Sequence, residues 1–388
     1  MVLPKLIIHL DVNGTIMPAD PIKSKHVKSM LNIHLSKQAF VRRIEEEESD
    51  QFVWWDGSPF HKGVQPPLLP QYRYTCHIRE HYKDEGHDHP YPVDDSISLE
   101  DFNSVHNIKC DNFTSTSLPG SVYKSELLNL MDTLEWKHET IEPYIVETLT
   151  LPVTDGRRMN IFVPAFLELL RHLNAEGQEF ILVIRTFGSD VPRLIPAFEL
   201  ISQGLHPDLR VPNCVSPPSI IGSLVRSPNS DGDPFVLQID SKDEKGSTVL
   251  IQGSPSIVSF LEGLPSKSVV MINDDYDTWR DHMFSPLFGK PVWLDIDRIS
   301  SVRHFLFDDN VNIDPTDSIA CVWLKDGVNS IWKPLPLDSQ AGKATIGTVL
   351  LQASLYFAIL KKDAFVSELT KANKRYESLR DRLGLSHR

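Results

Sequence analysis

Cysteine and positive charge are scarce in this chain, and long apolar runs are absent. Its 388 residues include only four cysteines, which are spaced too widely to indicate a disulfide framework and whose number fits a reducing compartment. No run of 18 apolar residues occurs, so the sequence predicts no transmembrane helix. Acidic residues outnumber basic ones, 52 to 39, and the net charge of −13 argues against nucleic acid as a partner.

The rest of the composition is that of an ordinary globular protein, with 41% hydrophobic and 23% charged residues. The length allows one doubly wound domain with a large insertion, or two domains. An apolar strand is expected from residue 5 onwards, which leaves no room for a signal or transit peptide before it. We therefore expect a cytoplasmic protein with no membrane partner.

The stretch from Lys5 to Thr15 gives the clearest local signal. Its apolar residues predict a short buried strand that ends at Asp11, and the following Asn13-Gly14 pair predicts a sharp turn. Open α/β sheets place their chemistry at the C-terminal ends of such strands. The fold class we expect is therefore α/β, with a doubly wound, Rossmann-like parallel sheet. A strand that ends in an Asx-type turn without chemistry fits the same residues.

This stretch resembles the first motif of the haloacid dehalogenase (HAD) superfamily, in whose phosphatases an apolar strand is followed by Asp-x-Asp-Gly-Thr. The resemblance implies that Asp11 is a nucleophile that becomes an aspartyl-phosphate. The second Asp of the motif is Asn13 here, and an amide cannot transfer a proton. General acid–base catalysis contributes about 10²–10⁴-fold, so three outcomes are open: a slow phosphatase, a phosphotransferase, or a relic that binds without turnover.

A helix predicted over residues 160–177 precedes an apolar strand from Phe180 to Thr186. This order resembles the second HAD motif, and it implies that the Thr186 hydroxyl binds a phosphoryl oxygen. Arg185 should point away from Thr186 because side chains alternate along a strand. We interpret Arg185 as structural.

Two later strands compete for the last HAD motif, an apolar strand that ends in paired carboxylates that hold Mg²⁺. One ends at Asp274 and Asp275, and the other ends at Asp308 and Asp309. The superfamily places a lysine before this strand, and Lys290 lies 18 residues ahead of Asp308. The position of Lys290 favours the later pair and leaves the earlier pair as the alternative.

The resemblance implies that Mg²⁺ is held by Asp11, by the main-chain carbonyl of Asn13 and by Asp308 or Asp309. Thr186 and Lys290 would balance the charge of the transferring phosphoryl group. The predicted function is a Mg²⁺-dependent phosphohydrolase or phosphotransferase that acts on a small phosphorylated substrate. The alternative is a catalytically inactive HAD-fold protein that binds phosphate or serves as a scaffold. Within the superfamily, the combination of Asp-Asp-Tyr-x-x-Trp, Gly-Lys-Pro and Phe-Asp-Asp-Asn resembles a group from protists.

The expected organisation is an α/β core formed by residues 1–16 and 155–340, interrupted by a cap at residues 17–154. Residues 341–388 are expected to form a C-terminal helix, predicted over 345–383, and a basic tail. Residues 21–43 predict another helix, within the cap. The cap also holds a group of histidines that fits either a zinc site or a solvated loop: His77, His81, His87 and His89.

Overall fold

The computed structural model describes residues 3–21, 23–36, 40–43, 52–54, 72–73, 110–116, 119–227, 233–240, 248–311, 318–327 and 331–385. The chain divides into two compact units. The first comprises Met1–Met17, Lys137–Leu151 and Asn160–Arg388, and the second comprises Pro18–Trp136 and Pro152–Met159. Among the described helices, none is both long enough and apolar enough to cross a membrane.

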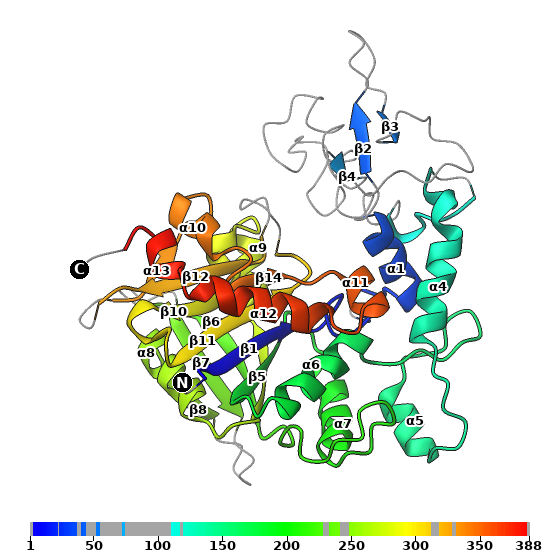
Figure 1. Cartoon of the computed structure of the whole chain (residues 1–388), viewed down its shortest axis with the longest axis horizontal. Coiled ribbons are helices and arrows are strands. Elements are labelled where there is room, and N and C mark those ends of the chain that lie inside the picture. The colour runs from blue at the N-terminus through cyan, green and yellow to red at the C-terminus, as the bar shows by residue number, and fades with distance from the viewer. Residues whose placement is uncertain are drawn as a thin grey trace. The chain divides into compact units, whose positions relative to one another are not determined.

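An eight-stranded mixed sheet forms the middle of the first unit (Figure 1). Its strand order is β14 (Leu350–Gln352), β11 (Val302–Asp308), β1 (Lys5–Asp11), β5 (Phe180–Thr186), β9 (Val269–Asp274), β6 (Ile220–Arg226), β7 (Phe235–Asp240) and β8 (Thr248–Gln252). Neighbouring strands are parallel from β14 to β6, whereas β7 is antiparallel to both of its neighbours. The expected α/β class with a largely parallel sheet is confirmed.

The central strand β1 consists almost entirely of buried residues, as expected of a strand that is covered on both faces. It pairs in parallel with β11 on one side and with β5 on the other. The C-terminal ends of these three strands therefore lie along one edge of the sheet, which is where an open α/β sheet binds ligands.

Helices cover one face of this sheet. They include α6 (Pro164–Ala175), α7 (Val191–Ser202) and α12 (Ala364–Tyr376), and α6 contacts α12 (Figure 1). The rings of Phe305 and Phe307 on β11 pack against Tyr376 and Phe365 on α12, with centroids 5.1 and 5.2 Å apart. A short helix, α5 (Pro143–Leu149), contacts α7.

A second, three-stranded sheet and helix α8 (Ser254–Gly263) belong to the layer on the other face. The small sheet has the order β10 (Lys290–Asp295), β12 (Ala320–Lys325) and β13 (Lys333–Leu335). Trp293 and Trp323 from this sheet pack edge-on against Phe235 of β7. One buried apolar cluster joins the two sheets and α8, and it includes Ile7, Val183, Leu237, Ile257, Val270, Trp293 and Trp323.

The predicted single helix over 345–383 is wrong. The segment instead contains β14, α11 (Leu355–Leu360), α12 and α13 (Leu379–Arg382), and α10 (Gln340–Thr345) precedes it. Val349, Leu350 and Leu351 are buried beside β11 as the edge of the large sheet. A short apolar run of this kind fits a strand and a helix equally well when only periodicity is considered.

The first unit also contains the short helix α9 (Tyr276–Asp281) and the 3₁₀ helices η2 (Pro286–Phe288) and η3 (Ile296–Arg298).

The second unit contains the helices α1 (Val27–Ser36) and α4 (Lys124–Leu134), which contact each other, and the 3₁₀ helix η1 (Pro119–Tyr123). Its small antiparallel sheet has the order β3 (Phe52–Trp54), β2 (Phe40–Arg43) and β4 (Tyr72–Arg73). The helix predicted over 21–43 is thus shorter, and β2 occupies its last residues. The four histidines of the possible zinc site lie outside the described residues.

Candidate metal centre

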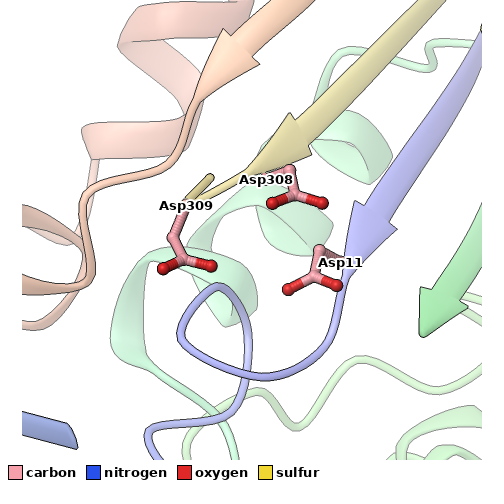
Figure 2. Close-up of side chains that lie close together, drawn as sticks. All are labelled: Asp11, Asp308 and Asp309. Carbon is pink, nitrogen blue, oxygen red and sulfur yellow. The ribbon is translucent and has the colours of Figure 1, made fainter. Parts of the chain in front are cut away.

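Three carboxylates meet at the C-terminal ends of β1 and β11. In the register of these strands Leu10 lies opposite Phe307, so Asp11 and Asp308 follow on neighbouring strands and on the same face. Ligand oxygens of Asp11, Asp308 and Asp309 all lie within 4.8 Å of one another, and the three residues are buried (Figure 2). Carboxylate oxygens are the ligands that hard divalent cations prefer, so this group could hold a metal ion.

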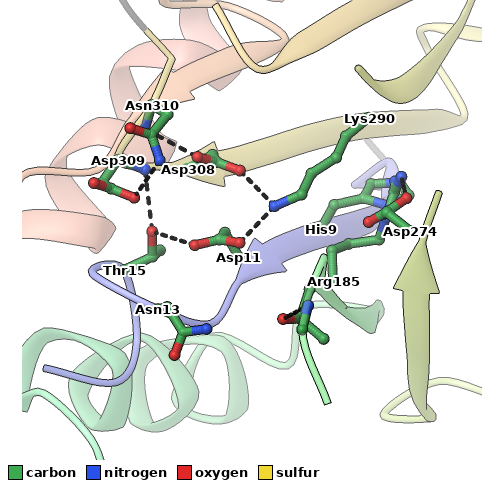
Figure 3. A network of polar contacts seen from close by, with 12 residues as sticks. His9, Asp11, Asn13, Thr15, Arg185, Asp274, Lys290, Asp308, Asp309 and Asn310 are labelled. Atoms are coloured by element: carbon green, nitrogen blue, oxygen red, sulfur yellow. Dashed lines mark hydrogen bonds and ion pairs between the residues drawn. The ribbon is translucent and has the colours of Figure 1, made fainter. Parts of the chain in front are cut away.

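Lys290 supplies the positive charge next to these carboxylates. Its Nζ lies 2.5 Å from Asp11 Oδ1 and 2.8 Å from Asp308 Oδ2, and its side chain is fully buried (Figure 3). Burial alone would lower the pKa of Lys290, but Asp11 and Asp308 outweigh it and raise that pKa above its ordinary value. The ammonium group is therefore charged at neutral pH.

Among the described residues, the three carboxylates outnumber this ammonium group. Burial and the neighbouring Asp308 raise the pKa of Asp11 well above its ordinary value, although Lys290 opposes them. Burial also raises the pKa of Asp308, and Asp309 adds to that rise while Lys290 opposes it. A low-dielectric pocket with more negative than positive groups favours an additional cation.

Local hydrogen bonds hold the three carboxylates in place. Gly14 adopts a positive φ of 79° in the turn after β1, and this turn brings Thr15 back to the strand end. The Thr15 hydroxyl donates to Asp11 Oδ2 at 3.3 Å and accepts from the main-chain N–H of Asp309 at 3.1 Å (Figure 3). Asn310 donates its main-chain N–H to Asp308 Oδ1 and its side-chain amide to Asp309 Oδ1. Thr15 and Asn310 belong to the two motifs, but reasoning from the sequence assigned no role to either side chain.

Two arginines fix the backbone on both sides of Lys290. Arg185 Nη1 donates to the carbonyl of Pro291 at 3.0 Å, and Arg226 Nη2 donates to the carbonyl of Gly289 at 3.0 Å. Arg185 is itself held by a buried ion pair with Asp274. The long side chains of β5 and β6 thus determine where β10 begins, and with it the position of the Lys290 ammonium group.

The earlier acidic pair has other partners. Both carboxylate oxygens of Asp274 accept hydrogen bonds from Arg185 Nε, at 2.9 and 3.1 Å. Asp275 caps α9, where its carboxylate accepts from the N–H and the hydroxyl of Thr278. The group of three around Asp11 consequently takes its other members from the later pair.

Asn13 and Thr186 share a different partner, which the sequence reasoning missed. Asn13 Nδ2 donates to Asp190 Oδ2 at 2.8 Å, and Thr186 Oγ1 donates to the same oxygen at 3.1 Å. The Thr186 hydroxyl also accepts from the N–H of Gly188 at 2.9 Å. Asp190 is buried and directly precedes α7. Its only signal in the sequence is its place four residues after the end of an apolar strand, at the start of a helix.

The fold and the site together define an α/β protein with a largely parallel mixed sheet and a buried acidic triad that could bind a metal ion. No family model, no curated protein and no solved structure matches the chain.

Proposed function

We propose that this chain is a HAD-like, Mg²⁺-dependent phosphohydrolase or phosphotransferase that forms an aspartyl-phosphate on Asp11. The observation that carries the proposal is the position of Lys290 Nζ between Asp11 and Asp308, beside the third carboxylate, Asp309. A carboxylate nucleophile can approach a phosphate dianion only where positive charge offsets their repulsion. The proposed substrate is a small phosphorylated molecule, since the net charge of −13 argues against nucleic acid.

Each residue of the site has a role in this proposal. An Asp11 oxygen attacks the phosphorus in line with the leaving oxygen, while the Lys290 ammonium balances the charge of the phosphoryl oxygens. Asp11, Asp308 and Asp309 would hold Mg²⁺, which would supply further positive charge to the transferring group. The Thr186 hydroxyl, at the end of the neighbouring strand β5, donates to a phosphoryl oxygen after leaving Asp190.

Hydrolysis of p-nitrophenyl phosphate tests the proposal. Wild-type protein should release p-nitrophenol with Mg²⁺ and lose this activity in EDTA. Asp11→Asn should lower kcat by more than about 10³-fold because it removes the nucleophile. Circular dichroism and thermal unfolding of both proteins control for folding. Activity that persists in Asp11→Asn would reject the assignment of the nucleophile.

A second candidate function is phosphate binding without turnover, and the observation that favours it is the amide at Asn13. In that case the wild type is silent, and Asn13→Asp should gain about 10²–10⁴-fold because a proton-transferring carboxylate is restored. Titration of the silent wild type with inorganic phosphate, followed by calorimetry, would then measure the binding function directly.

A further inference from the structure

The proposed reaction needs a group that transfers protons, and the side chain at position 13 cannot supply it. The oxygen that leaves the phosphorus in the first step gains a proton, and the water that attacks the aspartyl-phosphate in the second step loses one. A carboxylate suits both tasks because it can pass from the ionised to the protonated form and back. Such a carboxylate must lie beside position 13.

Asp190 is that carboxylate. Its Oδ2 is 2.8 Å from Asn13 Nδ2, and the residue is only 4% exposed. The same oxygen is 3.1 Å from the hydroxyl of Thr186, which ends the strand next to β1. Asp190 therefore contacts one residue in the turn after β1, Asn13, and one at the end of the neighbouring strand β5, Thr186. Its main-chain carbonyl also begins α7 by accepting from the N–H of Arg193 at 3.0 Å, which limits its movement.

The Asn13 amide adds an independent observation. Its Nδ2 is committed to Asp190, but its Oδ1 is buried without a hydrogen-bond partner among the described residues. A buried acceptor that lacks a donor is energetically unfavourable. It is therefore suited to receive a hydrogen bond from a ligand, such as an O–H of the attacking water.

We infer that Asp190 is the proton-transferring carboxylate of this site and that Asn13 orients the water beside it; the inference rests on the proposed function. In the second step the water oxygen forms a bond to phosphorus, the bond from phosphorus to the Asp11 oxygen breaks, and one water proton moves to Asp190. The Asp11 carboxylate and inorganic phosphate are released. In the next turnover Asp190 gives this proton to the leaving oxygen of the substrate, which restores the starting state.

A carboxylate–amide swap tests this inference. In Asp190→Asn the aspartyl-phosphate should form but persist, because p-nitrophenolate leaves without a proton whereas water still needs a base. With p-nitrophenyl phosphate and Mg²⁺ we expect a burst of about one p-nitrophenol per chain, protein-bound phosphate after acid quenching, and turnover lowered by about 10²–10⁴-fold. The double variant Asn13→Asp with Asp190→Asn keeps one carboxylate and one amide, and it should recover at least about tenfold of that loss.

Asp208→Asn is the matched control, because the carboxylate of Asp208 is 48% exposed, pairs with His138 and is not a member of the acidic triad. Its turnover should equal that of the wild type. Normal turnover in Asp190→Asn would overturn the inference alone. Loss of activity without bound phosphate, and without recovery in the swapped protein, would also overturn it, since Asp190 would then be structural. No Asp11-dependent turnover or bound phosphate in any variant would overturn the proposed function, and the inference with it.

Discussion

Lys290 is the residue on which the charge balance of the acidic triad depends. Lys290→Met keeps the side-chain length but leaves Asp11 and Asp308 buried without their ammonium partner. Removal of one member of a buried ion pair costs about 3–5 kcal/mol, so the free energy of unfolding in EDTA should fall by about that amount. Mg²⁺ should restore part of the loss by binding to the uncompensated carboxylates, and urea unfolding with and without Mg²⁺ measures both effects.

Lys325→Met is a suitable control for this prediction. Lys325 lies on the small sheet with Lys290 but is 23% exposed, and it pairs with Asp295 at 3.1 Å. A pair that stays in contact with water contributes less than a fully buried one, so this variant should lose less stability than Lys290→Met. Equal losses of unfolding free energy in the two variants would show that the ion pairs of Lys290 stabilise the fold no more than the Lys325–Asp295 pair does.

The residues of the triad could be predicted because their signal is local, whereas Asp190 could not. Asp11 and Asp308 each follow an apolar strand, and parallel strands end at one edge of a sheet. Asp190 follows Thr186 through a turn of no special composition, and only the fold brings it to Asn13. The prediction that Arg185 is structural agrees with its buried ion pair with Asp274. Its hydrogen bond to the carbonyl of Pro291 is a tertiary contact, which the spacing of residues in the sequence cannot reveal.

At the level of elements, β10 must approach β12 closely for Lys290 to reach the triad. Gly289 lies directly before β10, and a Cβ there would clash with the carbonyl oxygen of Ile319. Gly289→Ala should therefore displace the start of β10, lower the free energy of unfolding by about 1–3 kcal/mol and reduce p-nitrophenyl phosphate hydrolysis. Gly263→Ala is the control, since a Cβ at the end of α8 meets nothing within 4 Å. If both variants behave like the wild type, the close approach is not required.

Among the elements, several strands of the large sheet were predictable, whereas its edge strand β14 and the strand β10 of the small sheet were not. The helix before β5 and the strands β1, β5, β9 and β11 follow from apolar runs that end in polar residues. β10 carries Pro291 at its second position, which normally argues against a strand. Proline is tolerated there because β10 pairs with β12 alone and forms the edge of the small sheet.

Across the whole molecule, the division into units depends on contacts that the sequence does not display. Residues Lys137–Leu151 belong to the first unit, because α5 packs on α7 and the carbonyl of Leu149 accepts from the N–H of Ile161 at 2.9 Å. The expected cap over 17–154 included this segment, since composition alone does not separate a helix of the core from one of an insertion.

Stability of the whole chain should fall in mild acid. Burial lowers the pKa of His206 to about 4, although Asp208 opposes the shift, and His138 adds to it. An unfolded histidine has a pKa of about 6.5, so below that pH the unfolded state binds a proton that the folded state does not. The stability is therefore lost progressively as pH falls from about 6.5 to about 4, by about 3 kcal/mol for this group.

Urea unfolding at about pH 7 and about pH 4.5 measures this loss. His206→Gln removes the titrating ring, so the difference in unfolding free energy between the two pH values should be smaller in the variant than in the wild type. An equal difference in both proteins would contradict the assignment to His206.

The triad and its lysine come from different sheets, and this affects how the protein is assembled. A chain that had folded only as far as the large sheet would gather three carboxylates without the Lys290 ammonium group, and their mutual repulsion would oppose closure of that edge. Docking of the small sheet brings the Lys290 ammonium group to Asp11 and Asp308 and reduces the repulsion. In this scheme the small sheet docks last, and electrostatic attraction holds it in place as well as apolar burial. A molecule in which the small sheet has not docked lacks the complete site.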